Sequence, residues 1–507
     1  MRSDGLIEIE RRAYAERAKM NGPGNPFFLL GDGIDVEKRD IGGAVASFAP
    51  GHLLTIAATR AGKGTSHIVP NLLMYAGSTV VIDPKGENYA LTHARRREFG
   101  RVVRIDPFRV TGAIDPVSPY AGYNPMEFVE GEGNARRLAS VLLGDAPKGD
   151  GQFWHDEALN LLSAVILACA LMGRDQLGDV RDLLTASNAD RGDGPSDLMK
   201  RLTALADRTE EPGPMRRIKS FIGYETKMQS SILASINAKM SIWDTPEITK
   251  AVSQTDVPFG DLKQDVVTVY VVLPFDKMGD YGAFLRLIIG QFYQAMIKGG
   301  QAEGVPVACL IDEFPALGSM KELVRALAEI AGYGVRFWLF VQNISQLKSL
   351  YPDDWNVILS QCSTVNVFGV TDAETVDWLT KTLGQKTTAI GVPGINLGGG
   401  GRDADGGLNV NGGVNHGVQL TGAPLMTPGE IMEFLGVGQP WQLILLSGKR
   451  PIASQRLEFH KDENLSRMAG STEPEPLALP NDLRETQFWK GVPKGHSYGI
   501  RDANEDT

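Results

Sequence analysis

Residues 53–73 read LLTIAATRAGKGTSHIVPNLL, a hydrophobic strand followed by a turn of small residues and the start of a helix. This arrangement binds phosphate, because backbone N–H groups of the loop and of the helix N-terminus point at the anion. Gly62 allows the backbone to approach closely, and Lys63 can reach the β- and γ-phosphates. We therefore predict a phosphate loop made of Thr59, Arg60, Ala61, Gly62, Lys63, Gly64 and Thr65.

The loop departs at two positions from the common form G-x-x-x-x-G-K-[ST]. Ala57 replaces the first glycine, and Gly64 replaces the serine or threonine whose hydroxyl would bind Mg²⁺. The hydroxyl of Thr65, or a water molecule, could fill that position. A glycine turn beside a solvated lysine is the alternative interpretation, since Gly-Lys-Gly alone also occurs by chance.

A second motif, VACLIDEFPALG, occupies residues 307–318, where an apolar strand ends in Asp312 and Glu313. Asp312 there can hold Mg²⁺ and Glu313 can polarise the attacking water. Two carboxylates at the end of a buried strand are costly without a nearby cation. Capping of the next helix is the alternative, and Pro315 and Leu317, which follow at once, weaken it.

A glutamine, Gln342, ends the apolar run RFWLFVQ, residues 336–342. Its amide could contact the γ-phosphate or the attacking water, although a glutamine at a strand end also serves structural purposes. Together with the two preceding motifs it indicates a Mg²⁺-dependent ATPase. In this hypothesis Lys63, Glu313 and Gln342 are catalytic, while Asp312 and Thr65 bind the metal.

Seven short runs rich in Val, Ile and Leu predict an α/β fold with a mostly parallel sheet buried on both faces. They are residues 53–59, 78–84, 100–107, 266–274, 307–314, 336–342 and 364–369. Helical patterns at 282–300 and 320–334 connect some of these runs and end at glycine.

The sequence can be divided where its secondary-structure pattern or its residue composition changes. Residues 125–262 have helical patterns and no convincing strand, which predicts an inserted all-α domain; extra helices on the same core are the alternative. The nucleotide-binding domain then comprises residues 49–124 and 263–462, preceded by an N-terminal segment, 1–48. The Gly- and Asn-rich residues 391–424 are expected to form a flexible loop, and 463–507 a polar, partly ordered tail.

Composition excludes several classes of protein. The net charge of −10 argues against a nucleic-acid coat protein, although a local basic groove remains compatible with it. Cys169, Cys309 and Cys362 lie far apart in apolar runs, as in a reduced cytoplasmic protein, and the seven histidines show no metal-ligand spacing. No apolar run approaches the roughly 18 residues of a membrane span, so none is expected.

Several unusual runs occur beside these motifs. They are PNLL (70–73), DPKGE (83–87), YNPM (123–126), FWHDEALNLLSA (153–164), LIDEFPALG (310–318), GYGVRFWLFVQNISQL (332–347) and PLMTPGEI (424–431). Through them the sequence resembles coupling ATPases of type IV secretion systems, of the TraG type, over about residues 50–460.

The resemblance implies a RecA-like P-loop motor domain with an all-α domain inserted, assembled as a hexameric ring and similar to DNA translocases of the FtsK kind. It implies ATP and Mg²⁺ as cofactors. Expected partners are relaxase–DNA complexes or secreted proteins and the inner-membrane components of the channel. Members of the family typically carry N-terminal transmembrane helices. We expect this chain either to dock at the cytoplasmic face of the membrane through partners or to have lost an anchor.

Arginines raise two further questions. A ring motor is expected to use an arginine from a neighbouring subunit, for which Arg325 and Arg336 are candidates; a surface salt bridge is the alternative for Arg325. A basic cluster could line a nucleic-acid path or form a solvated helix face. It consists of Arg95, Arg96, Arg97, Arg101 and Arg104.

Two other functions compete with an export motor. One is an adaptor that binds nucleotide and recruits cargo without productive hydrolysis. The other is an intracellular DNA pump unrelated to secretion. Stimulation of turnover by DNA, steeper at low salt, is expected of the motor.

Overall fold

One sheet organises the molecule, and it joins segments from almost the whole sequence. The computed structural model describes residues 6–9, 28–35, 40–47, 51–112, 120–147, 149, 151–186, 195–256, 259–301, 304–397, 401–402, 408–409 and 412–470. Within these residues the sheet has twelve strands in the order β1-β3-β2-β16-β15-β10-β4-β9-β8-β5-β7-β6.

The central part of the sheet is parallel and confirms the predicted α/β class. Its strands are β4 (His52–Ala57), β5 (Thr79–Ile82), β6 (Arg101–Ile105), β7 (Val267–Val271), β8 (Val307–Ile311), β9 (Val335–Val341) and β10 (Cys362–Phe368). Each coincides with one of the seven apolar runs. Every residue of β4, β5, β7, β8 and β9 is buried, which explains why these runs are mostly apolar rather than alternating.

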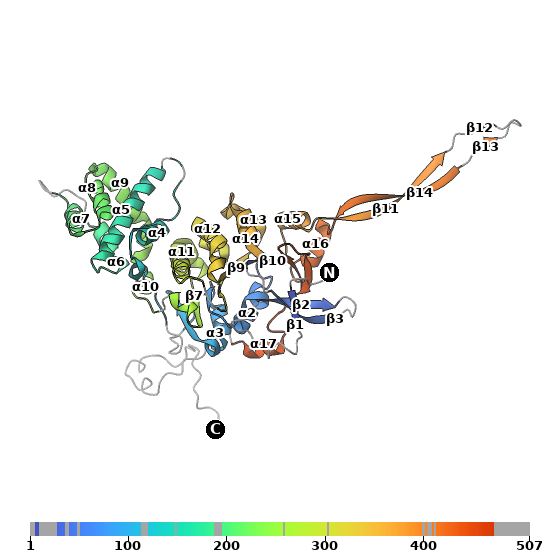
Figure 1. Cartoon of the computed structure of the whole chain (residues 1–507), viewed down its shortest axis with the longest axis horizontal. Helices are drawn as coiled ribbons and strands as arrows, with labels where there is room; N and C mark the ends of the chain where they lie inside the picture. The colour runs from blue at the N-terminus through green and yellow to red at the C-terminus, as the bar shows by residue number, and fades with distance from the viewer. Residues whose placement is uncertain are drawn as a thin grey trace, which may run out of the picture.

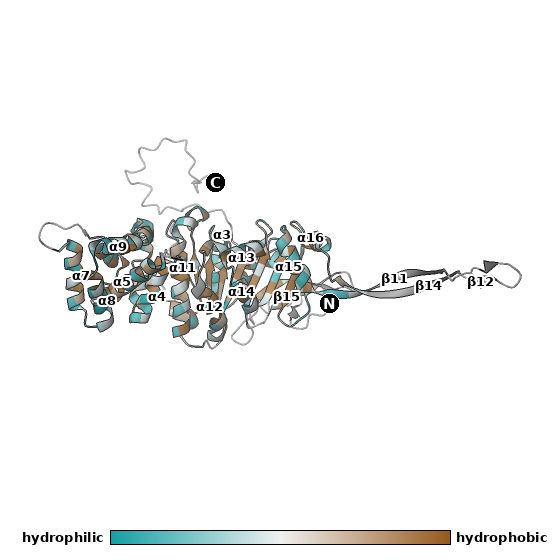
Figure 2. Ribbon diagram, turned by 90° about the horizontal axis from the view of Figure 1, so that it is seen from above, coloured by the Kyte–Doolittle hydropathy of each residue, from teal (hydrophilic) through white to brown (hydrophobic). Residues whose placement is uncertain are grey.

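Helices cover both faces of this sheet (Figure 1). One face carries α11 (Phe275–Lys298), α12 (Lys321–Ile330), α13 (Ile344–Leu350) and α14 (Trp355–Gln361); the other carries α2 (Val69–Met74), α3 (Glu87–Phe99) and α17 (Glu463–Met468). Successive strand residues face opposite sides of the sheet: Leu54 belongs to the core cluster that includes residues of α11 to α14, and Leu53 to the cluster that includes Leu72 of α2. Figure 2 shows the hydrophobic strands enclosed between the helices.

The N-terminal segment does not stand apart from the nucleotide-binding domain, as its expected boundary implied. Strands β1 (Leu6–Ile9), β2 (Phe28–Asp35) and β3 (Asp40–Ser47) extend the same sheet through β15 (Trp441–Leu446) and β16 (Ile452–Gln455), all in antiparallel pairs. Antiparallel strands at a sheet margin lack the continuous apolar signature that reveals buried parallel strands.

The region between β6 and β7 is helical. Its described residues contain α4 (Glu132–Leu143), α5 (Gly151–Leu171), α6 (Leu177–Leu184), α7 (Asp197–Arg208), α8 (Pro212–Ile222), α9 (Thr226–Met240) and α10 (Pro246–Ala251), and no strand. These helices form one end of the molecule (Figure 1). Ile232, Ile236 and Met240, spaced by four residues on α9, are all buried.

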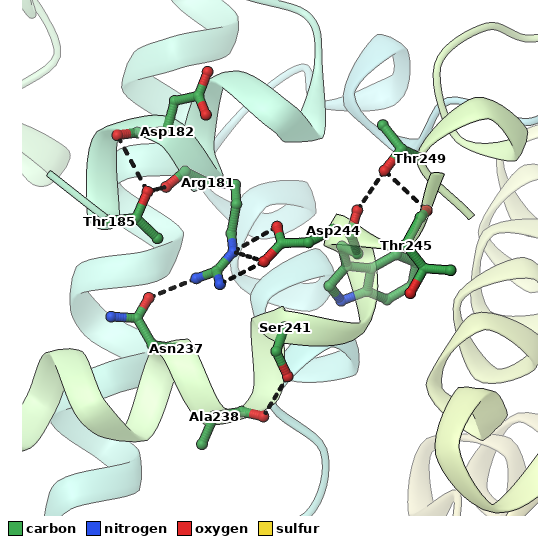
Figure 3. A network of polar contacts seen from close by, with 10 residues as sticks. Arg181, Asp182, Thr185, Asn237, Ala238, Ser241, Asp244, Thr245 and Thr249 are labelled. Atoms are coloured by element: carbon green, nitrogen blue, oxygen red, sulfur yellow. Dashed lines mark hydrogen bonds and ion pairs between the residues drawn. The ribbon is translucent and has the colours of Figure 1, made fainter. Parts of the chain in front are cut away.

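An arginine ties two parts of this helical region together (Figure 3). Arg181 of α6 donates to both carboxylate oxygens of Asp244, at 2.9 Å and 2.8 Å, and to Asn237 Oδ1 of α9 at 2.6 Å. Asp244 ends a short 3₁₀ turn, Ser241–Asp244, that follows α9 directly. This fork of hydrogen bonds from the Arg181 guanidinium therefore fixes the end of α9 against α6.

Among the described helices, α5 alone is long and apolar enough to cross a membrane by length and composition. Of its most apolar window, 56% is buried inside the protein, as in the core helix of a folded domain. All three cysteines are free and buried, as expected.

The Gly- and Asn-rich segment differs from the loop that its composition predicts. Strands β11 (Gln385–Leu397) and β14 (Gly412–Pro424) pair antiparallel over their full length and project from the body of the protein (Figure 1). Between them in sequence, β12 (Gly401–Arg402) pairs with β13 (Leu408–Asn409). Pairing across this ribbon satisfies backbone groups that a loop would expose, and residue composition does not report such pairing. The expected tail begins with α17, and its residues from 471 onward lie outside the described part.

Candidate functional site

The phosphate loop follows β4 and leads into a π-helical turn, Gly64–Ile68, that continues as α2. Two residues of the loop have left-handed backbone conformations, Arg60 with φ 62° and Gly62 with φ 95°. A side chain at Gly62 would also meet Arg456 Nη1 at 2.8 Å and Thr65 Oγ1 at 3.0 Å. Glycine at position 62 therefore satisfies both the turn and the close contact.

Lys63 connects the loop to the acidic motif. Its ammonium donates to the carbonyl of Ala57 at 3.2 Å. Burial lowers the pKa of Lys63, while the charges of Glu313 and Asp312 counteract that shift. The lysine and the two carboxylates thus lie in one electrostatic environment, at the carboxyl ends of β4 and β8.

Asp312 has a second buried carboxylate beside it. Asp83 follows β5, whose last residue, Ile82, pairs with Ile311 of β8. Burial raises the pKa of Asp83 to about 7 and that of Asp312 to about 6. The Asn88 side chain donates to Asp83 at 3.3 Å and also bonds Asp312.

This donor set fits a magnesium ion. Mg²⁺ prefers oxygen ligands and is usually held by one or two carboxylates together with waters and substrate phosphates. Asp312 supplies such a carboxylate, and the raised pKa values show acid groups that a cation would stabilise. No cluster of three or more His, Cys, Asp or Glu side chains with metal-binding geometry occurs in the described part of the chain.

Glu313 and Gln342 face one another across neighbouring strands. The Gln342 amide donates to the two Glu313 carboxylate oxygens at 3.3 Å and 3.4 Å. The backbone N–H of Gln342 donates to Gln346 Oε1 of α13 at 2.9 Å, which fixes the end of β9. The structure therefore brings together Lys63, Asp312, Glu313 and Gln342, the residues that three separate motifs nominated.

Thr65 lies within the same loop. Its hydroxyl donates to the carbonyl of Gly62 at 3.1 Å, which leaves oxygen lone pairs as acceptors or ligands. Gly64 has open space around it and supplies no hydroxyl.

The structure bears on two expectations about arginines. Arg336 is only 7% exposed and lies near the start of β9, away from Gln342 after its end, which argues against a role at a neighbouring subunit; Arg325 is exposed on α12. The basic cluster is not a continuous surface either, because Arg96 and Arg104 are buried. Arg96 bonds Thr268 Oγ1 at 2.8 Å and the carbonyl of Gly77 at 2.6 Å, a structural role.

Sequence reasoning missed three residues at the site. Asp83 begins the unusual run DPKGE and Asn88 follows it directly, but the sequence alone predicts no chemical role for that run. Arg456 comes from the segment after β16 and donates to the carbonyl of Ala61 in the phosphate loop. Since 395 residues separate this pair, no local signal could have revealed it.

Comparison with known proteins gives a consistent result. The sequence profile of a family described as Type IV secretory system Conjugative DNA transfer matches residues 6–479. Protein VirD4 of Rhizobium rhizogenes is 27% identical over 450 residues, which cover 86% of this chain and 63% of the relative. Conjugal transfer protein TraG of Escherichia coli is 29% identical over 414 residues, covering 76% and 62%. The chain thus spans less than two thirds of the length of these two relatives.

Solved structures share the fold. The bacterial conjugative coupling protein TrwBdeltaN70 superposes with a TM-score of 0.59 at 16% identity, covering 80% of this chain and 85% of that one. The plasmid coupling protein TrwB in complex with ADP and Mg²⁺ gives a TM-score of 0.59 at 15% identity, covering 81% and 85%. This likeness confirms the RecA-like P-loop architecture.

Proposed function

The chain belongs to the type IV secretory system conjugative DNA transfer family, and from that premise we propose that it is a Mg²⁺-dependent ATPase which couples hydrolysis to the delivery of DNA into a secretion channel. The observation that carries the proposal is the convergence of Lys63 with Asp312 and Glu313. The relatives named for conjugal transfer favour this function over an intracellular DNA pump.

In the proposed mechanism, the N–H groups of Thr59–Thr65 and the ammonium of Lys63 bind the phosphates. Lys63 would exchange the carbonyl of Ala57 for the β- and γ-phosphate oxygens. Asp312 and Thr65 would hold Mg²⁺, which when bound neutralises phosphate charge.

Glu313 polarises the attacking water and accepts its proton as the bond to the γ-phosphorus forms and the bond to the β-phosphate oxygen breaks. Gln342 holds the carboxylate of Glu313 in place and senses the γ-phosphate. TrwB has been solved with ADP and Mg²⁺ and with a non-hydrolysable ATP analogue, which supports the same ligands here.

The proposal extends to assembly and location. We infer a homo-oligomeric ring, a hexamer, in which the exposed Arg325 is the remaining candidate for an arginine supplied to the neighbouring site. The substrate is DNA, a relaxase–DNA complex or a secreted protein. The ring would work at the cytoplasmic face of the inner membrane, bound to components of the secretion system.

Steady-state phosphate release by the purified chain tests the proposal. Glu313→Gln should lower turnover by about 100-fold or more while nucleotide still binds. Lys63→Ala should lose both binding and turnover. A wild-type protein that binds ATP and Mg²⁺ but turns over no faster than Glu313→Gln would instead be the nucleotide-binding adaptor.

A further inference from the structure

A short segment after β16 lies across the phosphate loop. We call residues 456–459 the strap. The backbone N–H of Arg456 donates to the carbonyl of Pro440 at 2.7 Å, and that of Phe459 donates to the carbonyl of Thr65 at 3.1 Å. The strap is therefore fixed at one end to the β15 margin of the sheet and at the other to the phosphate loop.

The guanidinium of Arg456 adds side-chain contacts to these backbone bonds. It donates to the carbonyl of Ala61 through Nη1 and to the carbonyl of Gln439 through Nη2, the latter at 2.7 Å. It also lies 5.1 Å from the ring centre of Phe368, at the end of β10. The planar guanidinium holds its two Nη donors in a fixed fork, whereas the ammonium of a lysine is a single point of charge, so lysine would not be equivalent.

The positive charge of Arg456 is buried and is only partly balanced by a neighbouring carboxylate. Its side chain is 8% exposed, and burial lowers its pKa. Its ion-pair partner, Glu458, lies 3.8 Å away and is shared with His460 and Lys461. A buried positive charge beside a phosphate loop is stabilised by an anion in that loop, because burial strengthens the attraction between them.

The strap continues into packing against the helix that the loop begins. Leu457 of the strap is buried in one cluster with Leu465 of α17 and with Val69 and Leu73 of α2. The backbone N–H of Gly470 then donates to the carbonyl of Leu91 in α3 at 2.7 Å. The segment from 456 to 470 thus contacts both α2 and α3.

We propose that Arg456 is a positioning residue of the nucleotide site. It holds the Ala61–Gly62 peptide so that the N–H groups of the loop converge on phosphate, and it makes nucleotide affinity depend on the docked strap. By linkage, bound nucleotide must stabilise the docked strap to the same extent. This inference rests on the proposed function, since it assumes that the loop binds a nucleotide.

Titration with a fluorescent ADP and with a fluorescent ATP analogue, each in the presence of Mg²⁺, tests the first half. Arg456→Met should raise both dissociation constants by about tenfold, the loss expected for a hydrogen-bonded charged group. The turnover number at saturating ATP should stay within about threefold of wild type, because Glu313 and Gln342 do not touch Arg456. Arg456→Lys should recover only part of the affinity.

Arg467→Met is the matched control. Arg467 lies on α17 of the same segment, but its side chain is 69% exposed and pairs with Glu463 at the surface. Its replacement should leave the dissociation constants within about twofold of wild type, as for a surface ion pair. Thermal melts of all variants identify any that fail to fold, in which case Arg456→Lys carries the test.

Hydrogen exchange of the full-length protein tests the second half. Saturating ADP and Mg²⁺ should slow exchange in the peptide that contains Phe459, whose N–H bonds the loop, in wild type and less so in Arg456→Met. Two results would overturn this inference while leaving the proposed function intact. One is an unchanged nucleotide affinity in folded Arg456→Met, and the other is a hydrogen-exchange rate of the wild-type strap that is the same with and without nucleotide. Absence of any nucleotide binding by wild type would instead overturn the proposed function.

Discussion

The side-chain amide of Gln342 bonds both carboxylate oxygens of Glu313, at 3.3 Å and 3.4 Å, across the ends of β9 and β8. In the proposed mechanism, this glutamine would orient the carboxylate that activates water and so link the sensing of phosphate to the chemical step. The same pair also relates the active site to α13, since Gln346 holds the backbone of Gln342.

Gln342→Ala should slow turnover more than it weakens binding. Loss of the amide frees the Glu313 carboxylate, and misplacing a catalytic group by about 1 Å can cost up to about 100-fold. We expect the turnover number to fall about 10- to 100-fold and the dissociation constant for ADP to change less than about threefold. An equal loss in both quantities would show that Gln342 serves binding instead.

The buried acid Asp83 should make stability depend on pH. Burial raises its pKa from 3.8 to about 7. The folded state therefore holds the proton more tightly than the unfolded chain, and this stabilisation, fully present below about pH 4, is lost as pH rises through about 7. The melting temperature of the nucleotide-free protein should fall between about pH 5 and pH 8.

Asp83→Asn tests the assignment of that pH dependence. Asparagine cannot ionise but can still accept the Tyr89 N–H, which donates to Asp83 at 2.8 Å. The variant should melt higher than wild type at about pH 8 and show a shallower decline. Asp377→Asn, at an exposed position of α15, is the control and should follow wild type.

Arg96 should matter for stability and not for DNA. Arg96→Met leaves the carbonyl of Gly77 and Thr268 Oγ1 without their buried donor, at a cost of about 2–3 kcal/mol in urea unfolding. Arg101→Ala removes a side chain of the same cluster at an exposed position and should cost much less. A large loss of DNA affinity in folded Arg96→Met, at matched salt, would restore the nucleic-acid path that burial argues against.

Arg181 should stabilise the helical region measurably. Its bonds to Asp244 and Asn237 form a fork on a mostly buried side chain, so Arg181→Ala should lower the free energy of unfolding by about 1–2 kcal/mol. Arg201→Ala breaks the exposed pair with Asp197 on α7 and should cost no more than about 0.5 kcal/mol. Equal effects in thermal or urea unfolding would contradict a special role for the fork.

Much of the architecture follows from sequence because buried parallel strands are mostly apolar on both faces. The runs that contain the seven central strands are all rich in Val, Ile and Leu, and the motifs at their carboxyl ends meet because parallel strands end at one edge of a sheet. The antiparallel strands β1, β2 and β3 and the ribbon β11–β14 lack the signature, and they were missed. Gly- and Asn-rich composition predicts a loop at the ribbon, where cross-strand pairing decides the outcome.

The site divides in the same way. Lys63, Asp312, Glu313 and Gln342 each follow a recognisable strand, so their positions could be predicted together. Arg456 could not, because its place beside Ala61 depends on β16 pairing with β15 and on the path of the strap beyond it. The burial of Arg96 and Arg104 could not be predicted either. Charged side chains are rarely buried, and where they are, their partners are distant in sequence.

A structure of the protein with Mg²⁺ and a non-hydrolysable ATP analogue tests the central claim most directly. Lys63 Nζ should leave the carbonyl of Ala57 for the β- and γ-phosphates. A magnesium ion should lie at Asp312, bound directly at about 2.1 Å or through one water. Nucleotide bound away from the loop, or a metal with no path to Asp312, would contradict it.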